Sequence, residues 1–241
     1  MPSAIRVGLV GDFNALHKAH QAIPKALATA SEGAAESVWV PTDSVGTGHQ
    51  TLADLDGVWV VPGMPYRSAD GALRAIGHAR TSGTPLLGTS AGYQYVLIEY
   101  ARNVLGLAGA DHQKSNPQAA VPLIAPLVSA LPGVKARVRF TNGSVLRRAY
   151  GASESVEEYH CSFALNPRYR RLLEGGALAV TAVDDQDQVR AVELDGHPFF
   201  VATLFEPELR SLPAGAPSSP IVNAFVAACV RHRQNVSNAA P

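Results

Sequence analysis

The stretch "PLLGTSAGYQY", residues 85–95, decides how this chain folds. An apolar run ends in Gly88-Thr89-Ser90-Ala91-Gly92, and a helical pattern follows it directly. This is a G-x-S-x-G pattern, which is typical of a sharp turn that joins a strand to a helix and presents a nucleophilic serine. The stretch therefore predicts a strand–turn–helix unit and makes Ser90 a candidate nucleophile.

Apolar, β-rich runs alternate with helical patterns through the first hundred residues. The runs "IRVGLVGDF", "SVWVPTD", "DGVWVVPG" and "PLLGTS" predict strands. The stretches near "HQAIPKALATA", "SADGALRAIGHARTSG" and "AGYQYVLIEYARNVLG" predict helices. Such alternation predicts an α/β fold in which helices cover both faces of a mostly parallel sheet.

The second half of the chain follows a different pattern. Residues 107–135 are poorly periodic and rich in Ala, Pro and Gly, which predicts a long loop over one end of the sheet. Asn142-Gly143 lies between two strand-like runs and predicts a β-hairpin. "ALAVTAVDDQDQVRAVELDGHPFFVATLF" predicts successive strands, and "SPIVNAFVAACVRHR" predicts a last helix capped by Ser219, with a frayed tail after it.

Composition excludes several classes of protein. Of 241 residues, 46% are apolar and 17% are charged, which suits a globular chain. Twenty basic residues balance twenty acidic ones without a basic block, so we expect no nucleic-acid partner. Signal-peptide features and a membrane-spanning apolar run are both missing. Cys161 and Cys229 are too few for a disulfide framework, so we expect a reduced, cytoplasmic protein with no membrane partner.

Several motifs occur in a fixed order: "GLVGDF", "VPGMPYRSADG", "LLGTSAGYQYVLIEYARNVLGL", "YHCSFALNPRY" and "HPFFVATLFEPELRS". Over roughly residues 4–231, the chain resembles the C-terminal glutaminase domain of CTP synthase, a class I glutamine amidotransferase. The resemblance implies a flavodoxin-like sandwich with a small antiparallel β region, built as a single domain over residues 1–241. It does not include the synthetase domain that binds UTP and ATP, so we do not expect this chain alone to make CTP.

The resemblance implies a set of catalytic positions. The cysteine nucleophile of the family falls on Ser90, its activating histidine on Glu206, and its orienting glutamate is present as Glu208. The backbone amides of the family's oxyanion hole fall on Gly63 and Ala91. Two of the three catalytic side chains of the family are therefore expected to differ here.

The resemblance also implies ligand-binding positions. Gln94 matches a glutamine that lines the site. The glutamate that grips the amino group of the substrate falls at or near Lys114, and the arginine that grips its carboxylate falls on His160. A lysine would repel the ammonium group of glutamine. We therefore expect a small amino-acid-like or amide ligand, no cofactor, and no ordinary glutamine hydrolysis.

Glu206 and Glu208 form an expected carboxyl pair. A free glutamate has a pKa of about 4.3 and is a poor base for a serine hydroxyl at neutral pH. Two carboxyls that lie close together do not both ionise readily, so the pKa of one should rise, which suits general acid–base chemistry. The alternative is that Lys114, Arg67 or another arginine neutralises one of them.

Three interpretations of Ser90 remain open. It could simply fill a tight turn in a non-catalytic regulatory or partner-binding module. Such a module would use the surface that docks a synthetase-type partner in the family, and a homodimer is also possible. It could be the nucleophile of a serine hydrolase similar to peptidase E and cyanophycinase, with His160 or His112 reaching it. It could also take part in a different chemistry that uses the changed residues.

Cysteine and histidine residues give weaker signals. A histidine neighbour can lower the pKa of a thiol, so Cys161 beside His160 is a possible redox residue, although a buried, inert thiol is the alternative. Neighbouring strand residues point to opposite faces, so one of the two should line the pocket. No ligand spacing supports a metal site on His160 with the two glutamates, and His17 and His20 are interpreted as surface or loop residues.

Overall fold

The computed structural model describes residues 4–46 and 52–239, which form one ten-stranded sheet. Its order is β2-β1-β3-β4-β10-β9-β8-β6-β5, and β7 pairs with β6. The strands are β1 (Ile5–Val10), β2 (Ala35–Val40), β3 (Gly57–Val60), β4 (Leu86–Thr89), β5 (Ala110–His112), β6 (Val121–Phe140), β7 (Glu154–Leu165), β8 (Leu178–Val183), β9 (Val189–Leu194) and β10 (Phe200–Thr203).

Five α-helices and four short 3-10 helices connect these strands in the described part of the chain. The α-helices are α1 (Lys18–Ala30), α2 (Ala69–Ser82), α3 (Ala91–Asn103), α4 (Val145–Tyr150) and α5 (Pro220–Ala239). The 3-10 helices are η1 (Thr42–Ser44), η2 (Leu52–Asp54), η3 (Pro167–Leu173) and η4 (Pro207–Ser211). No helix within residues 4–46 and 52–239 has the length and hydropathy that crossing a bilayer requires.

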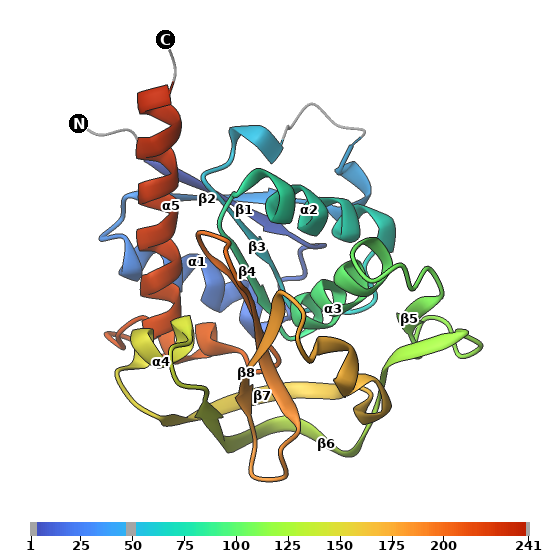
Figure 1. Cartoon of the computed structure of the whole chain (residues 1–241). Helices are drawn as coiled ribbons and strands as arrows, with labels where there is room; N and C mark the ends of the chain where they lie inside the picture. Colours follow the sequence, from blue (N-terminus) through green and yellow to red (C-terminus); the bar gives the residue numbers. More distant parts are fainter. Residues whose placement is uncertain (1–3, 47–51, 240–241) are drawn as a thin grey trace.

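Strands β2, β1, β3, β4 and β10 run parallel to one another and form the first half of the sheet. Helices α1 and α5 pack together on one face of this half, and α2 and α3 pack together on the other face (Figure 1). Strands buried on both faces must be apolar almost throughout, which is why Val7, Leu9 and Trp59 are completely buried. The predicted α/β fold is confirmed.

The second half of the sheet is antiparallel and departs from the sequence-based expectation. Residues 107–135 do not form one long loop, because they contain β5 and most of the long strand β6, which pairs with β7 over nearly its whole length. The end of β6, residues 134–140, alternates apolar and polar residues and predicts a strand, whereas its first part, rich in Ala, Pro and Gly, has no such period. Pro126 and Pro132 also interrupt the run, which is tolerated where the β6–β7 register shifts.

The predicted hairpin at Asn142-Gly143 is wrong, because helix α4 separates β6 from β7. The Ser144 side chain accepts a hydrogen bond from Arg147 N at 3.0 Å and caps this helix. The Glu193 carboxylate accepts hydrogen bonds from the first two helical N–H groups, at 2.7 and 3.0 Å. These contacts from outside the turn favour a helix there. The expected frayed tail is also helical, since α5 continues to Ala239.

The turns that follow β1 and β3 meet at the point where the strand order reverses, which is where open α/β sheets bind ligands. The Asp12 carboxylate holds these turns together. It accepts hydrogen bonds from Thr42 N at 3.1 Å, Thr42 Oγ1 at 2.9 Å and Arg67 N at 2.7 Å. The segment after β3, which includes Gly63, is therefore fixed to the neighbouring strand ends.

Candidate active site

Ser90 occupies the predicted turn between β4 and α3. Its backbone has φ 53° and ψ −106°, a region that a non-glycine residue rarely adopts and that costs about 1–3 kcal/mol. The Ser90 N–H donates to Thr203 O at 2.9 Å, which ties the turn to β10. A Cβ atom at Gly92 would lie 2.1 Å from Val60 O, so only glycine allows α3 to start this close to β3. The strand–turn–helix prediction is confirmed.

A cavity of about 270 Å³ opens beside Ser90. It gathers the ligand-binding and backbone positions that the sequence predicts, and it adds several residues that the sequence did not single out. Its lining residues are His17, Gly63, Met64, Ser90, Ala91, Gln94, His112, Lys114, His160, Cys161, Ser162 and Phe163. Because Gly63 follows β3 and Ser90 follows β4, the cavity lies at the carboxyl ends of parallel strands.

Glu206 lies after β10, buried beneath this turn with 2% of its surface exposed. Burial raises the pKa of its carboxyl to about 7, while the charge of His160 and a hydrogen bond donated by the Ser90 side chain act in the opposite direction. A carboxyl of this pKa is as strong a base as a histidine. The expectation that Glu206 would be too weak a base therefore fails, because it used the value of an exposed side chain.

Glu208 lies deeper and is completely buried. Burial, followed by the negative charge of Glu206, raises the pKa of Glu208 well above its usual range. The predicted rise through the neighbouring carboxyl is therefore confirmed for Glu208, whereas the rise at Glu206 comes from its burial. Among the described residues, no lysine or arginine forms an ion pair with either glutamate, and Arg67 lies beside Asp43 at 3.8 Å instead. The alternative of a neutralising cation is wrong for this part of the chain.

Gln94 and His112 form a buried hydrogen-bonded unit in the cavity wall. The His112 Nδ1 atom accepts from Lys114 N at 3.1 Å, so Nε2 carries the proton and donates to Gln94 Oε1 at 3.0 Å. The Gln94 Nε2 atom donates to Phe163 O at 2.8 Å. Burial lowers the pKa of His112 to about 4, so this ring stays neutral and fixes the carboxamide of Gln94. The hypothesis that His112 serves as the base of Ser90 is wrong.

His160 lines the cavity from β7, and its Nε2 atom lies 2.8 Å from Glu158 Oε1. Lys135 Nζ lies 3.8 Å from the other oxygen of Glu158. Within the described residues, no histidine nitrogen is hydrogen-bonded to the Ser90 hydroxyl. This geometry favours a role for His160 in the wall of the pocket and gives no support to a Ser90–His160 pair.

His17 and His20 are not the surface residues that the sequence suggested. Their rings stack with centroids 4.7 Å apart, and His20 is buried while His17 lines the cavity. Burial lowers the pKa of both rings. The His-x-x-His spacing at the start of α1, which puts both rings on one helical face, is the signal that could have identified them.

His20 positions the peptide that precedes Gly63. Its Nδ1 atom accepts from Asn14 N at 3.0 Å, so Nε2 donates to Pro62 O at 2.7 Å. The C=O and N–H of a trans peptide point in opposite directions, so the Gly63 N–H is directed away from His20. The N–H groups of Gly63 and Ala91 have no hydrogen-bond partner among the described residues, so both remain available to a ligand at the cavity.

Cys161 does not have the properties of a redox residue. Burial raises the pKa of its thiol to about 12, with Arg190 lowering it and Glu206 raising it, so the thiol stays protonated. Cys161 and His160 both contribute to the cavity wall, contrary to the expectation that only one would. Within residues 4–46 and 52–239, no three His, Cys, Asp or Glu side chains are arranged to hold a metal ion.

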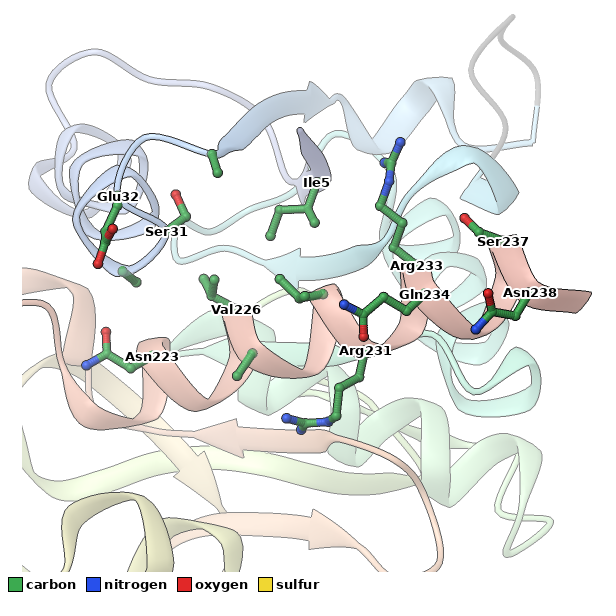
Figure 2. Close-up of a pocket in the computed structure, with 14 residues that line it drawn as sticks. Ile5, Ser31, Glu32, Asn223, Val226, Arg231, Arg233, Gln234, Ser237 and Asn238 are labelled. Atoms are coloured by element: carbon green, nitrogen blue, oxygen red, sulfur yellow. The ribbon is translucent and has the colours of Figure 1, made fainter. Parts of the chain in front are cut away.

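A larger cavity, of about 920 Å³, lies elsewhere, between α5 and the segment that joins α1 to β2 (Figure 2). Ile5, at the amino end of β1, contributes to it, so it lies at the end of the parallel strands opposite to Ser90. Arg233 in its wall donates to Asp56 Oδ2 at 2.8 Å. We place the candidate active site at the smaller cavity, because a strained serine, buried carboxyls and free backbone N–H groups meet there.

The family model for glutamine amidotransferase class-I matches residues 17–227. The chain belongs to this family. Two relatives, both CTP synthases, come from Methanopyrus kandleri and Aeropyrum pernix, and each is 35% identical to this amidotransferase domain. The matches cover 93% and 95% of this chain but only 45% and 46% of those proteins. The chain therefore spans less than half the length of these relatives.

A solved structure supports the same fold. The Trypanosoma brucei CTPS glutaminase domain with bound acivicin has a TM-score of 0.85 and 22% sequence identity. The match covers 95% of this chain and 94% of that domain. Together with the two relatives, it makes this chain a CTP synthase-like class I amidotransferase domain with the predicted α/β fold.

Proposed function

We propose that this amidotransferase domain cleaves the C–N bond of a small amide other than free glutamine. The contact between Ser90 and Glu206 carries the proposal, because it gives the hydroxyl at a nucleophile turn a buried base whose pKa is about 7. In this proposal, Ser90 and Glu206 stand where other family members use cysteine and histidine. Glu208, held neutral by its burial, supports the charge state of Glu206.

The proposed reaction follows the groups at the cavity. Ionised Glu206 accepts the proton of the Ser90 hydroxyl while Ser90 Oγ attacks the amide carbonyl carbon. The N–H groups of Gly63 and Ala91 donate to the carbonyl oxygen as it gains negative charge. Glu206 then returns the proton to the leaving nitrogen, which departs as ammonia or an amine. A water molecule hydrolyses the remaining ester and restores the Ser90 hydroxyl.

Lys114 supports the proposed choice of ligand. It lines the cavity and is exposed, and its ammonium group forms no ion pair among the described residues. A positive charge here repels the α-ammonium group of glutamine and attracts a carboxylate. We therefore propose an ω-amide of a dicarboxylic acid, such as glutaramate or succinamate, in which a carboxylate replaces the amino-acid end.

Ammonia release from glutaramate, succinamate, glutamine and asparagine tests this proposal. The purified chain is compared with Ser90→Ala, with Glu206→Gln, and with Ser153→Ala as a matched control at an exposed serine outside the cavity. We expect release from a dicarboxylic amide that both active-site variants abolish and the control retains. Release from glutamine at an equal or higher rate would contradict the ligand. Binding of these amides without release from any would make the chain a non-catalytic module.

A further inference from the structure

A second cavity, of about 580 Å³, shares strand β7 with the Ser90 cavity. Tyr159 lines the second cavity, and its neighbour His160 lines the first. Apolar residues of β6, among them Ala125, Leu127 and Leu131, form one wall, and the turn between β8 and β9 forms another. The volume is within the range of cavities that hold small organic ligands.

Arg190 places an unpaired donor in this wall. The residue is 6% exposed, and its Nη2 atom donates to Asp184 Oδ2 at 2.6 Å. Its Nη1 atom is shielded from bulk water and has no hydrogen-bond partner among the described residues. Leaving such a donor unpaired is costly, so an acceptor atom that reached it would be bound favourably.

Tyr159 places a second unpaired group beside it. The guanidinium carbon of Arg190 lies 5.8 Å from the centre of the Tyr159 ring. The Tyr159 side chain is completely buried, and its hydroxyl also lacks a partner in the described part of the chain. Burial raises the pKa of this phenol above its usual range, so it keeps its proton and can donate it.

The charged groups of the wall are already paired with one another. Asp184 Oδ1 accepts from Gln186 N at 2.9 Å and from Gln188 N at 2.8 Å. Arg137 Nη2 lies 2.8 Å from Asp185 Oδ1. The two arginines of the wall are therefore balanced by two aspartates. A second anion would meet the carboxylate that already neutralises Arg190, so a neutral acceptor fits better than a charged one.

We propose that this cavity binds a small molecule with an apolar body and a neutral carbonyl oxygen, such as a carboxamide, which accepts hydrogen bonds from Arg190 Nη1 and Tyr159 Oη. The apolar body lies against the β6 wall. The site is separate from the proposed chemistry at Ser90, since none of its lining residues lines the Ser90 cavity.

Benzamide is a suitable probe. Benzoate, which carries a carboxylate in place of the carboxamide, and toluene, which has no acceptor oxygen, are its controls. We expect NMR titration of the full chain to give millimolar binding of benzamide, with shifts in β6, β7 and the turn after β8. Loss of one hydrogen bond should weaken binding about fivefold in Tyr159→Phe and in Arg190→Met. Tyr169→Phe, outside this cavity, should bind as the wild type does.

Each outcome decides the proposal. No titration with benzamide, equal binding of toluene, or stronger binding of benzoate would overturn it. If Arg190→Met fails to fold, Tyr159→Phe still removes a single oxygen and decides the outcome alone. Ser90→Ala should leave the titration unchanged, which separates failure at this cavity from failure of the proposed amide hydrolysis.

Discussion

Thr89 Oγ1 donates a hydrogen bond to Glu208 Oε1 over 3.1 Å. The same oxygen accepts from Trp59 Nε1 at 3.1 Å, so one hydroxyl joins β3 to the deeper carboxyl. The residue before the candidate nucleophile thus holds the deeper carboxyl in place. This contact links the stability of the sheet to the charge state of the site.

Thr89→Val should destabilise the fold by about 2–3 kcal/mol, because it leaves both a buried indole N–H and a buried carboxyl without a partner. Thr89→Ser keeps the hydroxyl and should restore most of that loss. Urea unfolding of the three proteins measures the difference. Equal stability of the valine and serine variants would show that the hydroxyl contributes nothing.

The contribution of Glu206 to stability should fall as pH rises from 5 to 8. The folded-state pKa of Glu206 is about 7 against an ordinary 4.5, so the native state binds more protons than the unfolded state between these values. For this group alone the loss is up to about 3 kcal/mol. The stability of the wild type relative to Glu206→Gln, measured by urea unfolding, separates this contribution from the histidines, whose lowered pKa values act in the opposite direction. This difference should fall over the range, whereas the difference between the wild type and Glu174→Gln, at an exposed site, should stay constant. A difference for Glu206→Gln that rises with pH would contradict the assignment.

Ser90→Gly should be about 1 kcal/mol more stable than Ser90→Ala. Both variants remove the hydroxyl, but only glycine adopts a φ of 53° without strain, and this gain exceeds its entropic cost. Thermal unfolding of the pair checks the prediction. If alanine proved the more stable variant, the turn would not be strained.

Lys114→Glu should exchange the ligand preference of the pocket. Reversal of this charge should strengthen glutamine binding about tenfold and weaken glutaramate binding by a similar factor, which is about 1.4 kcal/mol in each case. Calorimetric titration with both amides measures the change. Lys18→Glu, an exposed lysine outside the cavity, is the control. Unchanged preference would exclude Lys114 from ligand selection.

His20→Phe should lower kcat about 10- to 100-fold with little change in KM, because the ring would no longer hold Pro62 O and the Gly63 N–H would lose its direction. Phenylalanine keeps an aromatic ring beside Trp39, which limits the structural change. His78→Phe, on α2 away from the cavity, is the control. A rise in KM with normal kcat would contradict a positioning role.

The parallel half of the fold could be predicted because β1, β3 and β4 are continuous apolar runs and a helical pattern follows each of the three. The Ser90 turn was predictable because its short motif contains Gly92, and only glycine lets α3 pass this close to Val60. Strand β6 was predictable only at its end, where residues 134–140 alternate apolar and polar residues, because its first part has no such period. The hairpin prediction failed because a distant residue decides the local structure: Glu193, 48 residues from Val145, accepts from the first helical N–H groups.

The chemistry of the site was harder to predict than its position. The pKa of Glu206 depends on burial by segments that are distant in the sequence, and a pattern of residues gives only its unperturbed value. His20 is buried for the same kind of reason, by contacts with Trp39 and Pro62. The G-x-S-x-G motif and the family resemblance therefore predicted Ser90 and the carboxyl pair as candidates, while their protonation states required the three-dimensional structure.

The residues of the candidate site come from both halves of the sheet. Ser90 and Glu206 follow neighbouring strands of the tightly packed parallel half. By contrast, Lys114 lies in the segment between β5 and β6, and His160 lies in β7. Substitutions at Lys114 or His160 should therefore change the wall that faces a ligand without altering the packing that holds Ser90 and Glu206 together.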